Sequence, residues 1–512
     1  MTSPAVRRPD RWLILGVLCL AQLVVVLDNT VLNVAVPSLT RELGAGTADV
    51  QWMVSAYSLA QAGLLITAGG LADRYGRKRV QLIGLALFGC GSLAAALADS
   101  PGRLIAARAG MGVGGSLLMA TTLAILVRVF DAEERPKAIG GWAAVTSLGF
   151  AAGPVIGGLL LDHFWWGSVF IVNLPVVVLG LVAIARLVPE SKDPRGDRPD
   201  LLGAALCTTA MLGLVFAVIS GPEHGWTGAR TLASAAVGAA ALAGFVHWER
   251  RTEHPMLDMG FFADPRFRGA ISGGVLVAFG MGGSLFLLTQ QLQFVLGYDP
   301  LQAGVRVVPM AATVVALNMT GLGARLAARV SAPVAIAGGM ALMAGGLAAV
   351  ALFGRDGSYA GTCAGLVLMG AGVAFAQPAM AAALMGAIPP ERAGVGSGLA
   401  GTLSELGTSV GVAVLGALLT ARFAAGLPAG FGGDAARSLP DALRHAADGP
   451  DAAALADRAR QAFTSGLTAS QLIGAAAVLA GGLVAGHLLR RAGDRAAPAA
   501  AQGPGDRAEV AG

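Results

Sequence analysis

The sequence predicts an all-α, polytopic membrane protein with about fourteen spanning helices, because of its composition and the lengths of its apolar blocks. Hydrophobic residues occupy 55% of the 512 positions and charged residues only 13%, with a mean hydropathy of +0.67. A soluble domain carries about 25% charged residues, so this chain has too few charges to cover a water-facing surface. Its apolar blocks are about twenty residues long, enough for a helix to cross the roughly 30 Å hydrocarbon core of a bilayer.

The apolar blocks follow one another along almost the whole chain. They cover residues 12–36, 50–70, 80–98, 102–127, 138–160, 166–188, 201–220, 231–248, 269–296, 301–323, 332–353, 360–386, 396–421 and 467–489. The first block is too long for the apolar region of a cleaved signal peptide and follows Arg7, Arg8 and Arg11, so we expect it to remain as an anchor. An even number of spans places both termini on one side of the membrane.

The distribution of lysine and arginine orients these spans. With both termini in the cytoplasm, 25 of the 36 basic residues fall on the cytoplasmic side and 9 outside, while Arg108 and Arg306 lie within spans. Arginine greatly outnumbers lysine, and alanine and glycine are abundant, which is typical of a bacterial genome of high GC content. We therefore expect a multi-pass protein of a bacterial inner membrane with cytoplasmic termini.

A short loop sequence occurs twice in the chain. Residues 70–79 read Gly-Leu-Ala-Asp-Arg-Tyr-Gly-Arg-Lys-Arg, and residues 321–330 read Gly-Leu-Gly-Ala-Arg-Leu-Ala-Ala-Arg-Val. Repeats of this kind indicate a transporter built from two related halves. We predict an N-terminal six-helix bundle at 1–190, a linker with two inserted spans at 191–265, a C-terminal six-helix bundle at 266–490 with a long extracellular loop at 422–466, and a cytoplasmic tail at 491–512.

Asp28 and Glu405 are the acids that fall well inside predicted spans. A charge within the bilayer costs several kcal/mol, so an ionisable residue there is a functional candidate. Asp28 lies ~13 Å from the outer end of its span, and Arg108 lies roughly 9 Å from the same surface. A packed Asp28–Arg108 pair would offset much of each desolvation cost. The pair is either a switch coupled to protons or a static ion pair.

Glu405 lies near the middle of the thirteenth span, with no basic residue near it in the sequence. Burial disfavours the charged form of a carboxyl group, so Glu405 could bind and release a proton near neutral pH. It could equally be the counter-charge for a cationic substrate, or stay neutral through hydrogen bonds to helix neighbours such as Ser404. All six histidines lie in loops or near span ends, so any proton relay should use carboxylates.

The loop after the second span carries a second candidate, which we interpret as a cytoplasmic gate. Its residues are Gly69, Asp73, Arg74, Gly76 and Arg77. Asp73 can accept hydrogen bonds from the start of the next helix or from an arginine, which would make the loop a latch. Membrane anchoring by positive charge explains the basic residues, but not Asp73 or the glycines.

Small residues recur at intervals of about four in the fifth span. They are Gly149, Gly153, Pro154, Gly157 and Gly158. The glycines leave a smooth face for close helix packing, and the proline permits a bend.

We expect no enzymatic activity, cofactor, metal or ATP site. A phosphate-binding loop needs a Gly-Lys pair, whereas Lys78, Lys137 and Lys192 follow Arg, Pro and Ser. The four cysteines lie inside apolar blocks without metal or disulfide spacing. Basic residues form short clusters between spans, which argues against nucleic acid. An ion gradient is the remaining common source of energy.

Together these motifs resemble the major facilitator superfamily, and within it the fourteen-span drug:proton antiporters. The similar segments are 28–37 in the first helix, 69–79 in the cytoplasmic loop, Arg108 with Gly112 in the fourth helix, 149–158 in the fifth, 166–175 at the start of the sixth and 293–304 at the exit of the ninth. The resemblance implies that Arg108 takes part in proton coupling. It also implies export of a lipophilic drug or antibiotic, including self-resistance to an endogenous antibiotic, by alternating access.

The resemblance further implies a central substrate cavity. We expect it to be lined by Asn33, Tyr57, Gln61, Gln290, Gln291 and Asn318. Asn318 stands where some exporters of multivalent cations carry an acid, so dicationic substrates are less expected. Glu405 stands where many relatives have a basic or neutral residue.

The expected partners are a small lipophilic organic substrate, protons and the lipid bilayer, and the protein is expected to be a monomer. Two other functions remain open. One is proton-coupled uptake or export of a nutrient or non-antibiotic metabolite, although the glycine-proline run of the fifth span argues against uptake. The other is a membrane sensor or scaffold without transport, against which the two buried carboxyls argue.

Overall fold

The computed structural model describes residues 8–131, 133–192, 200–253, 255, 257, 259–354, 359–387, 393–428, 438–447 and 451–501. Over these ranges the chain is helical and contains no β-strand. Arg7, part of the predicted linker and the end of the predicted tail lie outside the described residues.

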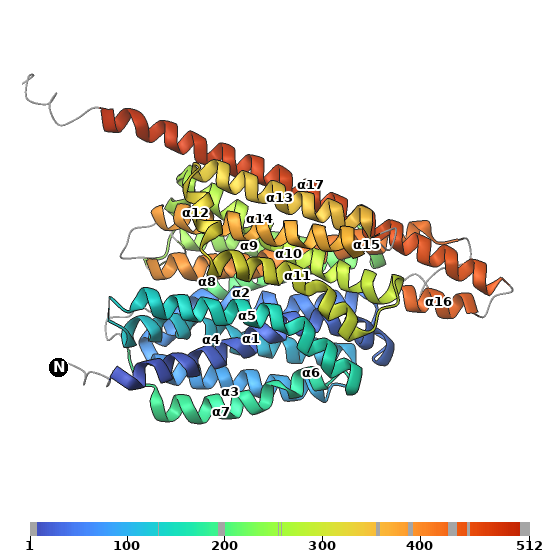
Figure 1. Cartoon of the computed structure of the whole chain (residues 1–512), viewed down its shortest axis with the longest axis horizontal. Helices are drawn as coiled ribbons and strands as arrows, with labels where there is room; N and C mark the ends of the chain where they lie inside the picture. The colour runs from blue at the N-terminus through green and yellow to red at the C-terminus, as the bar shows by residue number, and fades with distance from the viewer. Residues whose placement is uncertain are drawn as a thin grey trace, which may run out of the picture.

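The N-terminal half forms one layer of long helices (Figure 1). Its elements are α1 (Arg8–Glu42), α2 (Thr47–Tyr75), α3 (Arg77–Ala96), α4 (Pro101–Val129), α5 (Arg135–His163), α6 (Ser168–Ile171) and α7 (Asn173–Leu187). The short α6 and the longer α7 together make one membrane span of 20 residues, Ser168–Leu187.

The C-terminal half lies against this layer (Figure 1). Its elements are α10 (Pro265–Gln290), α11 (Pro300–Met319), α12 (Leu322–Ala328), α13 (Ala332–Phe353), α14 (Tyr359–Gly386), α15 (Ala393–Gly426), α16 (Leu439–Ala447) and α17 (Ala452–Ala501). A 3-10 turn, Met259–Ala263, precedes α10, and a π-helical turn, Gln291–Val295, follows it.

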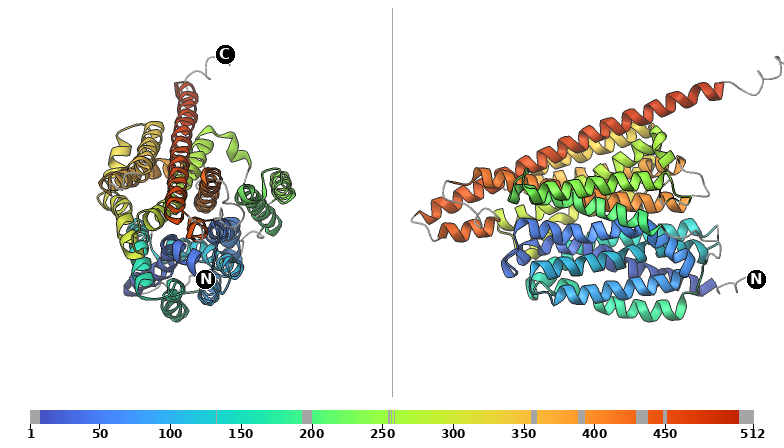
Figure 2. Two further views of the ribbon diagram at one scale, coloured as in Figure 1. Left: turned by 90° about the vertical axis from the view of Figure 1, so that its right-hand side faces the viewer. Right: turned by 180° about the vertical axis from the view of Figure 1, so that it is seen from behind.

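Between the halves, the chain forms α8 (Leu201–His224) and α9 (Ala229–Glu249). An end-on view places this pair at one side of the molecule (Figure 2). α8 packs on both α2 and α15, and so contacts both halves. The limits of the two predicted bundles and of the predicted linker stay a prediction.

Each predicted apolar block lies on a helix. Among the described residues, twelve helices are long and apolar enough to cross a membrane, and α2, bent by 54°, makes a thirteenth. The remaining predicted block lies on α5, a helix of 29 residues. The predicted all-helical membrane fold is therefore confirmed.

The predicted long loop at 422–466 is largely helical. α15 continues to Gly426, α16 follows, and α17 begins at Ala452 and runs for 50 residues. Phe463 of α17 packs edge-on against Phe423 of α15, with ring centroids 5.4 Å apart. Alanine-rich sequence favours helix even outside an apolar block, which explains why hydropathy alone indicated a loop.

Aspartate caps fix the starts of three helices. Asp200 accepts a hydrogen bond from the Gly203 amide at 2.8 Å, and Asp264 accepts one from the Arg266 amide at 2.7 Å. Asp299 caps α11 in the same way, through the Gln302 amide at 2.6 Å. Proline follows Asp264 and Asp299 at the first helical position, where its missing N–H costs nothing.

The small residues of α5 allow two close helix crossings. A Cβ on Gly149 would lie 2.6 Å from Leu23, and one on Gly157 would lie 2.9 Å from Val31, so this face packs on α1. Gly158 faces the other way, and a Cβ there would lie 2.5 Å from the Leu301 backbone of α11. Gly153 likewise meets Thr30 of α1, while the Pro154 carbonyl meets Gly304 of α11. The predicted smooth face of α5 therefore packs on α1 within the N-terminal half. Pro154 and Gly158, beside that face, pack on α11 of the C-terminal half.

Replacing Gly157 with alanine should destabilise the fold by about 1–3 kcal/mol, because the added methyl group overpacks the crossing with α1. The measurement is the thermal unfolding midpoint of the purified protein in detergent. Gly110→Ala on α4 is the matched control, because no atom lies within 4 Å of a Cβ at that position. A midpoint for Gly157→Ala equal to that of Gly110→Ala would contradict the packing argument.

Candidate functional site

Both ends of the described chain lie on one side of the molecule, which we call the terminal side (Figure 1). The opposite side, where α1 ends and α2 begins, is the distal side. These names fix positions along the helices without assuming which side faces the cytoplasm.

Asp28 and Arg108 form the predicted ion pair in the interior of the N-terminal half. Asp28 of α1 and Arg108 of α4 are 3% and 1% exposed, and Arg108 Nη1 donates to Asp28 Oδ2. Arg108 Nε also donates to the Met53 carbonyl at 3.1 Å, and the guanidinium lies 4.4 Å from the ring centroid of Tyr57. A carboxylate, a carbonyl and an aromatic face thus surround the buried cation.

Asn173 of α7 is a polar neighbour of this pair that the sequence did not single out. Its side chain is 2% exposed and interacts with the Asp28 carboxyl. Asn173 Nδ2 also donates to Ser92 Oγ at 3.0 Å, and Ser92 Oγ donates to the Phe170 carbonyl at 2.8 Å. The sequence signal for this residue is an asparagine inside an apolar span. Because asparagine is not ionisable, it is not found among the charged residues of the spans.

Glu405 reaches the same site from the C-terminal half. The side chain lies on α15, partly buried, beside Ser58 of α2 and within electrostatic range of Arg108. Tyr57 interacts electrostatically with both Asp28 and Glu405. A positive charge within electrostatic range of Glu405 therefore comes from the opposite half, where Arg108 is paired with Asp28. Its polar neighbour is Ser58, rather than the expected Ser404.

The loop between α2 and α3 is held by two carboxylates. Asp73 accepts hydrogen bonds from Arg77 Nε at 2.9 Å and Nη2 at 2.7 Å, so the expected arginine partner is formed. Glu190, beyond α7, binds the start of α3 by accepting from the Lys78 amide at 3.1 Å and the Arg79 amide at 3.3 Å. The backbone amides at the start of α3 therefore bind Glu190, whereas Asp73 binds the side chain of Arg77.

Of the two glycines in this loop, Gly76 cannot be replaced without strain, whereas Gly69 has space for a side chain. Gly76 has φ of +109°, and a Cβ there would lie 2.7 Å from Glu190 Oε1, so both backbone and space require glycine. Gly69 has no atom within 4 Å of a Cβ position. Arg74 lies over the Tyr75 ring, 5.7 Å from its centroid. Gly321, in the repeated loop, also has a positive φ, of +65°.

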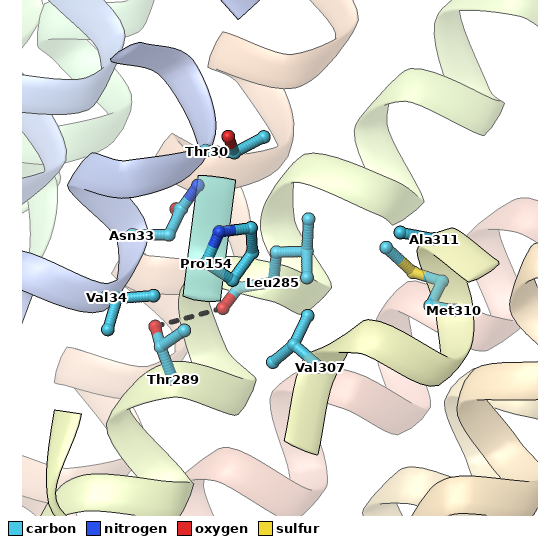
Figure 3. A pocket seen from close by; sticks show the side chains of 9 residues that line it. All are labelled: Thr30, Asn33, Val34, Pro154, Leu285, Thr289, Val307, Met310 and Ala311. Carbon is cyan, nitrogen blue, oxygen red and sulfur yellow. Dashed lines mark hydrogen bonds between the residues drawn. The ribbon is translucent and has the colours of Figure 1, made fainter. Parts of the chain in front are cut away.

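A small cavity lies between the two halves (Figure 3). Its lining consists of Thr30, Asn33, Val34, Pro154, Leu285, Thr289, Val307, Met310 and Ala311. Its free space of about 10 Å³ holds roughly one water molecule. On the distal side, Gln293 Nε2 bridges the halves by donating to the Val34 carbonyl at 2.9 Å. In this conformation the halves are thus closed together around the cavity.

Of the residues expected to line a substrate cavity, Asn33 lines this small cavity, and the expected lining of the substrate cavity stays a prediction. Gln290 Nε2 donates to the Phe286 carbonyl of its own helix at 3.3 Å, and Gln291 packs against Gly354. Thr289, one residue earlier, lines the cavity instead. Asn318 lies exposed near the terminal-side end of α11.

The other two predicted lining residues pack inside the N-terminal half. Tyr57 covers Arg108, and Gln61 Nε2 contacts Met119 Sδ at 3.5 Å. Helix phase decides these positions, because hydropathy locates a span without fixing which face points toward the centre.

Replacing one member of the Asp28–Arg108 pair should destabilise the protein more than replacing both. A single Asp28→Leu or Arg108→Met change leaves a buried ionisable group without its partner, at a cost of about 3–5 kcal/mol. The double variant removes both groups. The measurement is the unfolding midpoint of all four proteins at one pH, and a double variant less stable than either single would contradict the pairing.

Comparison with known proteins agrees with this architecture. Residues 18–412 match the model of the Major Facilitator Superfamily. The chain is 38% identical over 501 residues to the multidrug efflux pump LfrA of Mycolicibacterium smegmatis. This alignment covers 96% of this chain and 99% of the relative. It is 32% identical over 413 residues to the tetracenomycin C resistance and export protein of Streptomyces glaucescens, covering 80% and 76%.

Solved structures share the fold. A bacterial homologue of the human lysosomal transporter Spinster, in an inward-facing and unoccupied conformation, aligns with a TM-score of 0.66 and 18% identity. The alignment covers 95% of this chain and 98% of that one. The chain is a multi-pass inner-membrane protein that belongs to the major facilitator superfamily.

Proposed function

We propose that the chain exports a lipophilic drug or antibiotic across the inner membrane in exchange for protons. The named relatives, a multidrug efflux pump and an antibiotic export protein, support this substrate class. The observation that carries the coupling mechanism is the buried Asp28–Arg108 pair with Glu405 facing it from the other half.

The orientation follows from charge. The 25 basic residues assigned to the terminal side, against 9 on the distal side, support a cytoplasmic terminal side and an outer distal side. Closure of the halves around the cavity and at Gln293 then closes the route to the outside.

The coupling mechanism follows from the number of charges in the site. One guanidinium neutralises one carboxylate, so Asp28, Arg108 and Glu405 are together neutral when one carboxyl carries a proton. While Asp28 is ionised it holds Arg108 within the N-terminal half. Protonation of Asp28 releases that hold and leaves Glu405 as the other acid within range of Arg108. The attraction between the halves therefore depends on which acid is protonated.

Such a proton-dependent attraction can bias the two arrangements of the halves in alternating access. Export then needs the proton gradient, without a cofactor or ATP, and a monomer contains the complete site. The bound partners are the substrate, protons and lipid. Uptake or export of a nutrient is the alternative, and the export proteins among the relatives argue against it.

Replacing Asp28 with asparagine should abolish proton-coupled efflux. The amide cannot bind and release a proton as the carboxyl group does, while Arg108 remains in the site. The assay follows pH-gradient-driven movement of ethidium in everted membrane vesicles, and the rate should fall about tenfold or more. Asp99→Asn is the matched control, because Asp99 pairs with Arg103 at an exposed position. Full proton-coupled activity in Asp28→Asn would disprove this assignment.

Replacing Glu405 with glutamine should weaken export of cations more than export of neutral compounds, if the carboxylate is their counter-charge as well as a proton acceptor. The vesicle assay compares ethidium, a cation, with chloramphenicol, a neutral compound. Glu42→Gln, at the exposed distal end of α1, serves as the control. An equal loss for both compounds would assign Glu405 to proton handling alone, without a role as counter-charge.

A further inference from the structure

A row of buried polar side chains runs along the face of α2 that meets α15. Gln51, Ser55 and Ser58 are spaced by four and three residues, which places them on one face of the helix. Each is at most 1% exposed. Within the described part of the chain, Gln51 Oε1 and Ser55 Oγ have no hydrogen-bond partner.

The facing side of α15 carries a matching row. Thr402, Glu405 and Ser409 are spaced by three and four residues, so they also share one face. Thr402 and Ser409 are 4% and 0% exposed. Their hydroxyl groups likewise lack a hydrogen-bond partner among the residues that the structure describes.

The contacts between the two helices set their register. Gln51 packs against Gly416, and a Cβ on Gly401 would lie 2.6 Å from Leu65, so the helices run antiparallel. Ser58 lies beside Glu405, between these two contacts. This register places Ser409 about level with Ser58, and Ser55 about one helical turn further toward the distal side.

A buried hydroxyl or amide without a partner costs about 1–3 kcal/mol, and buried water commonly satisfies such groups. Gln51 and Ser58 are separated along the helix axis by about 10 Å, with Ser55 between them. Each step is therefore about 5 Å, a distance that one bridging water covers. The two rows thus offer the polar partners that bridging water molecules would need along a path that ends at Glu405.

The inserted helix α8 separates this seam from lipid. Leu59 of α2, Val215 and Ile219 of α8 and Ala413 of α15 form one apolar cluster. Trp52 of α2 and Phe216 of α8 also stack, with ring centroids 5.6 Å apart. α8 and α9 lie at the outside of the molecule beside this seam (Figure 2). The polar row therefore lies inside a protein wall.

Gln51 closes the distal end of the row in this conformation. It lies one helical turn from the start of α2 at Thr47, and a Cβ on Gly416 would lie 2.7 Å from its Cδ atom. Parting α2 from α15 at their distal ends would free Gln51 and admit water.

We propose that this row is the route by which protons from the distal side reach Glu405. The inference rests on the proposed function and adds its proton path. A proton from distal water moves along the bridging water molecules, each serine hydroxyl accepting one proton and donating another, and ends on the Glu405 carboxylate. In the described part of the chain, Arg108 of α4 and Tyr57 of α2 act electrostatically on Glu405, with Asp28 behind Arg108.

The test replaces Ser55 and Ser409 together by valine, which fills the path without adding charge. The purified protein in liposomes is assayed for ethidium-driven proton movement with an internal pH dye, and for ethidium counterflow without a proton gradient. Proton movement should fall about tenfold or more, while counterflow stays within about twofold of the unaltered chain.

Ser470→Val is the matched control, because Ser470 on α17 is also fully buried with a hydroxyl that lacks a partner in the described residues. It should leave both measurements unchanged. If the valine pair does not insert, Ser55→Ala with Gln51→Leu tests the same row with smaller changes.

Three other outcomes would overturn the inference. Proton movement in the double variant equal to that of Ser470→Val would show that the row carries no protons. Parallel loss of counterflow and proton movement would assign the residues to folding or substrate passage. Counterflow without any proton movement in the unaltered chain would refute the proposed coupling itself, and the path with it.

Discussion

The structure depends on accommodating one permanent positive charge inside the membrane. A guanidinium stays charged in proteins, so the surroundings of Arg108 must offset the free-energy cost of burying its charge. Asp28, the Met53 carbonyl and the Tyr57 ring provide that environment from α1 and α2. Since Glu405 of α15 also lies within range, the same charge links the two halves electrostatically. The packing of four helices from both halves is organised around one guanidinium.

Features that depend on local sequence could be predicted. Apolar block length located the spans, because a helix must satisfy its backbone within the bilayer. The helical rise placed Asp28 and Arg108 at similar depth, and they do pair. Which face of a helix points inward was not predictable from hydropathy, and the π-helical turn after Gln290 shifts the phase further. The neighbours of Glu405 come from helices distant in sequence, so no local pattern could reveal them.

The two repeated loops show how related halves diverge. The loop at Gly76 is held by Asp73 and by Glu190, which anchor an arginine and the start of α3. At the equivalents of Asp73 and Arg77, the loop at Gly321 has Ala324 and Ala328, so this ion pair has no counterpart there. The glycines with positive φ, Gly76 and Gly321, also occupy different positions of the repeat. The turn geometry therefore differs between the two loops, and the carboxylate that could make the loop a latch occurs only in the N-terminal copy of the repeat.

The arrangement of two acids around Arg108 has a consequence for energetics. If a monovalent cation takes the place of a proton at Glu405, their exchange is electroneutral, and only the pH gradient drives it. A neutral compound exchanged for the same proton moves one net charge, worth roughly 2.3 kcal/mol per 100 mV of membrane potential. One fixed guanidinium would thus make export of neutral compounds sensitive to voltage and export of cations insensitive to it.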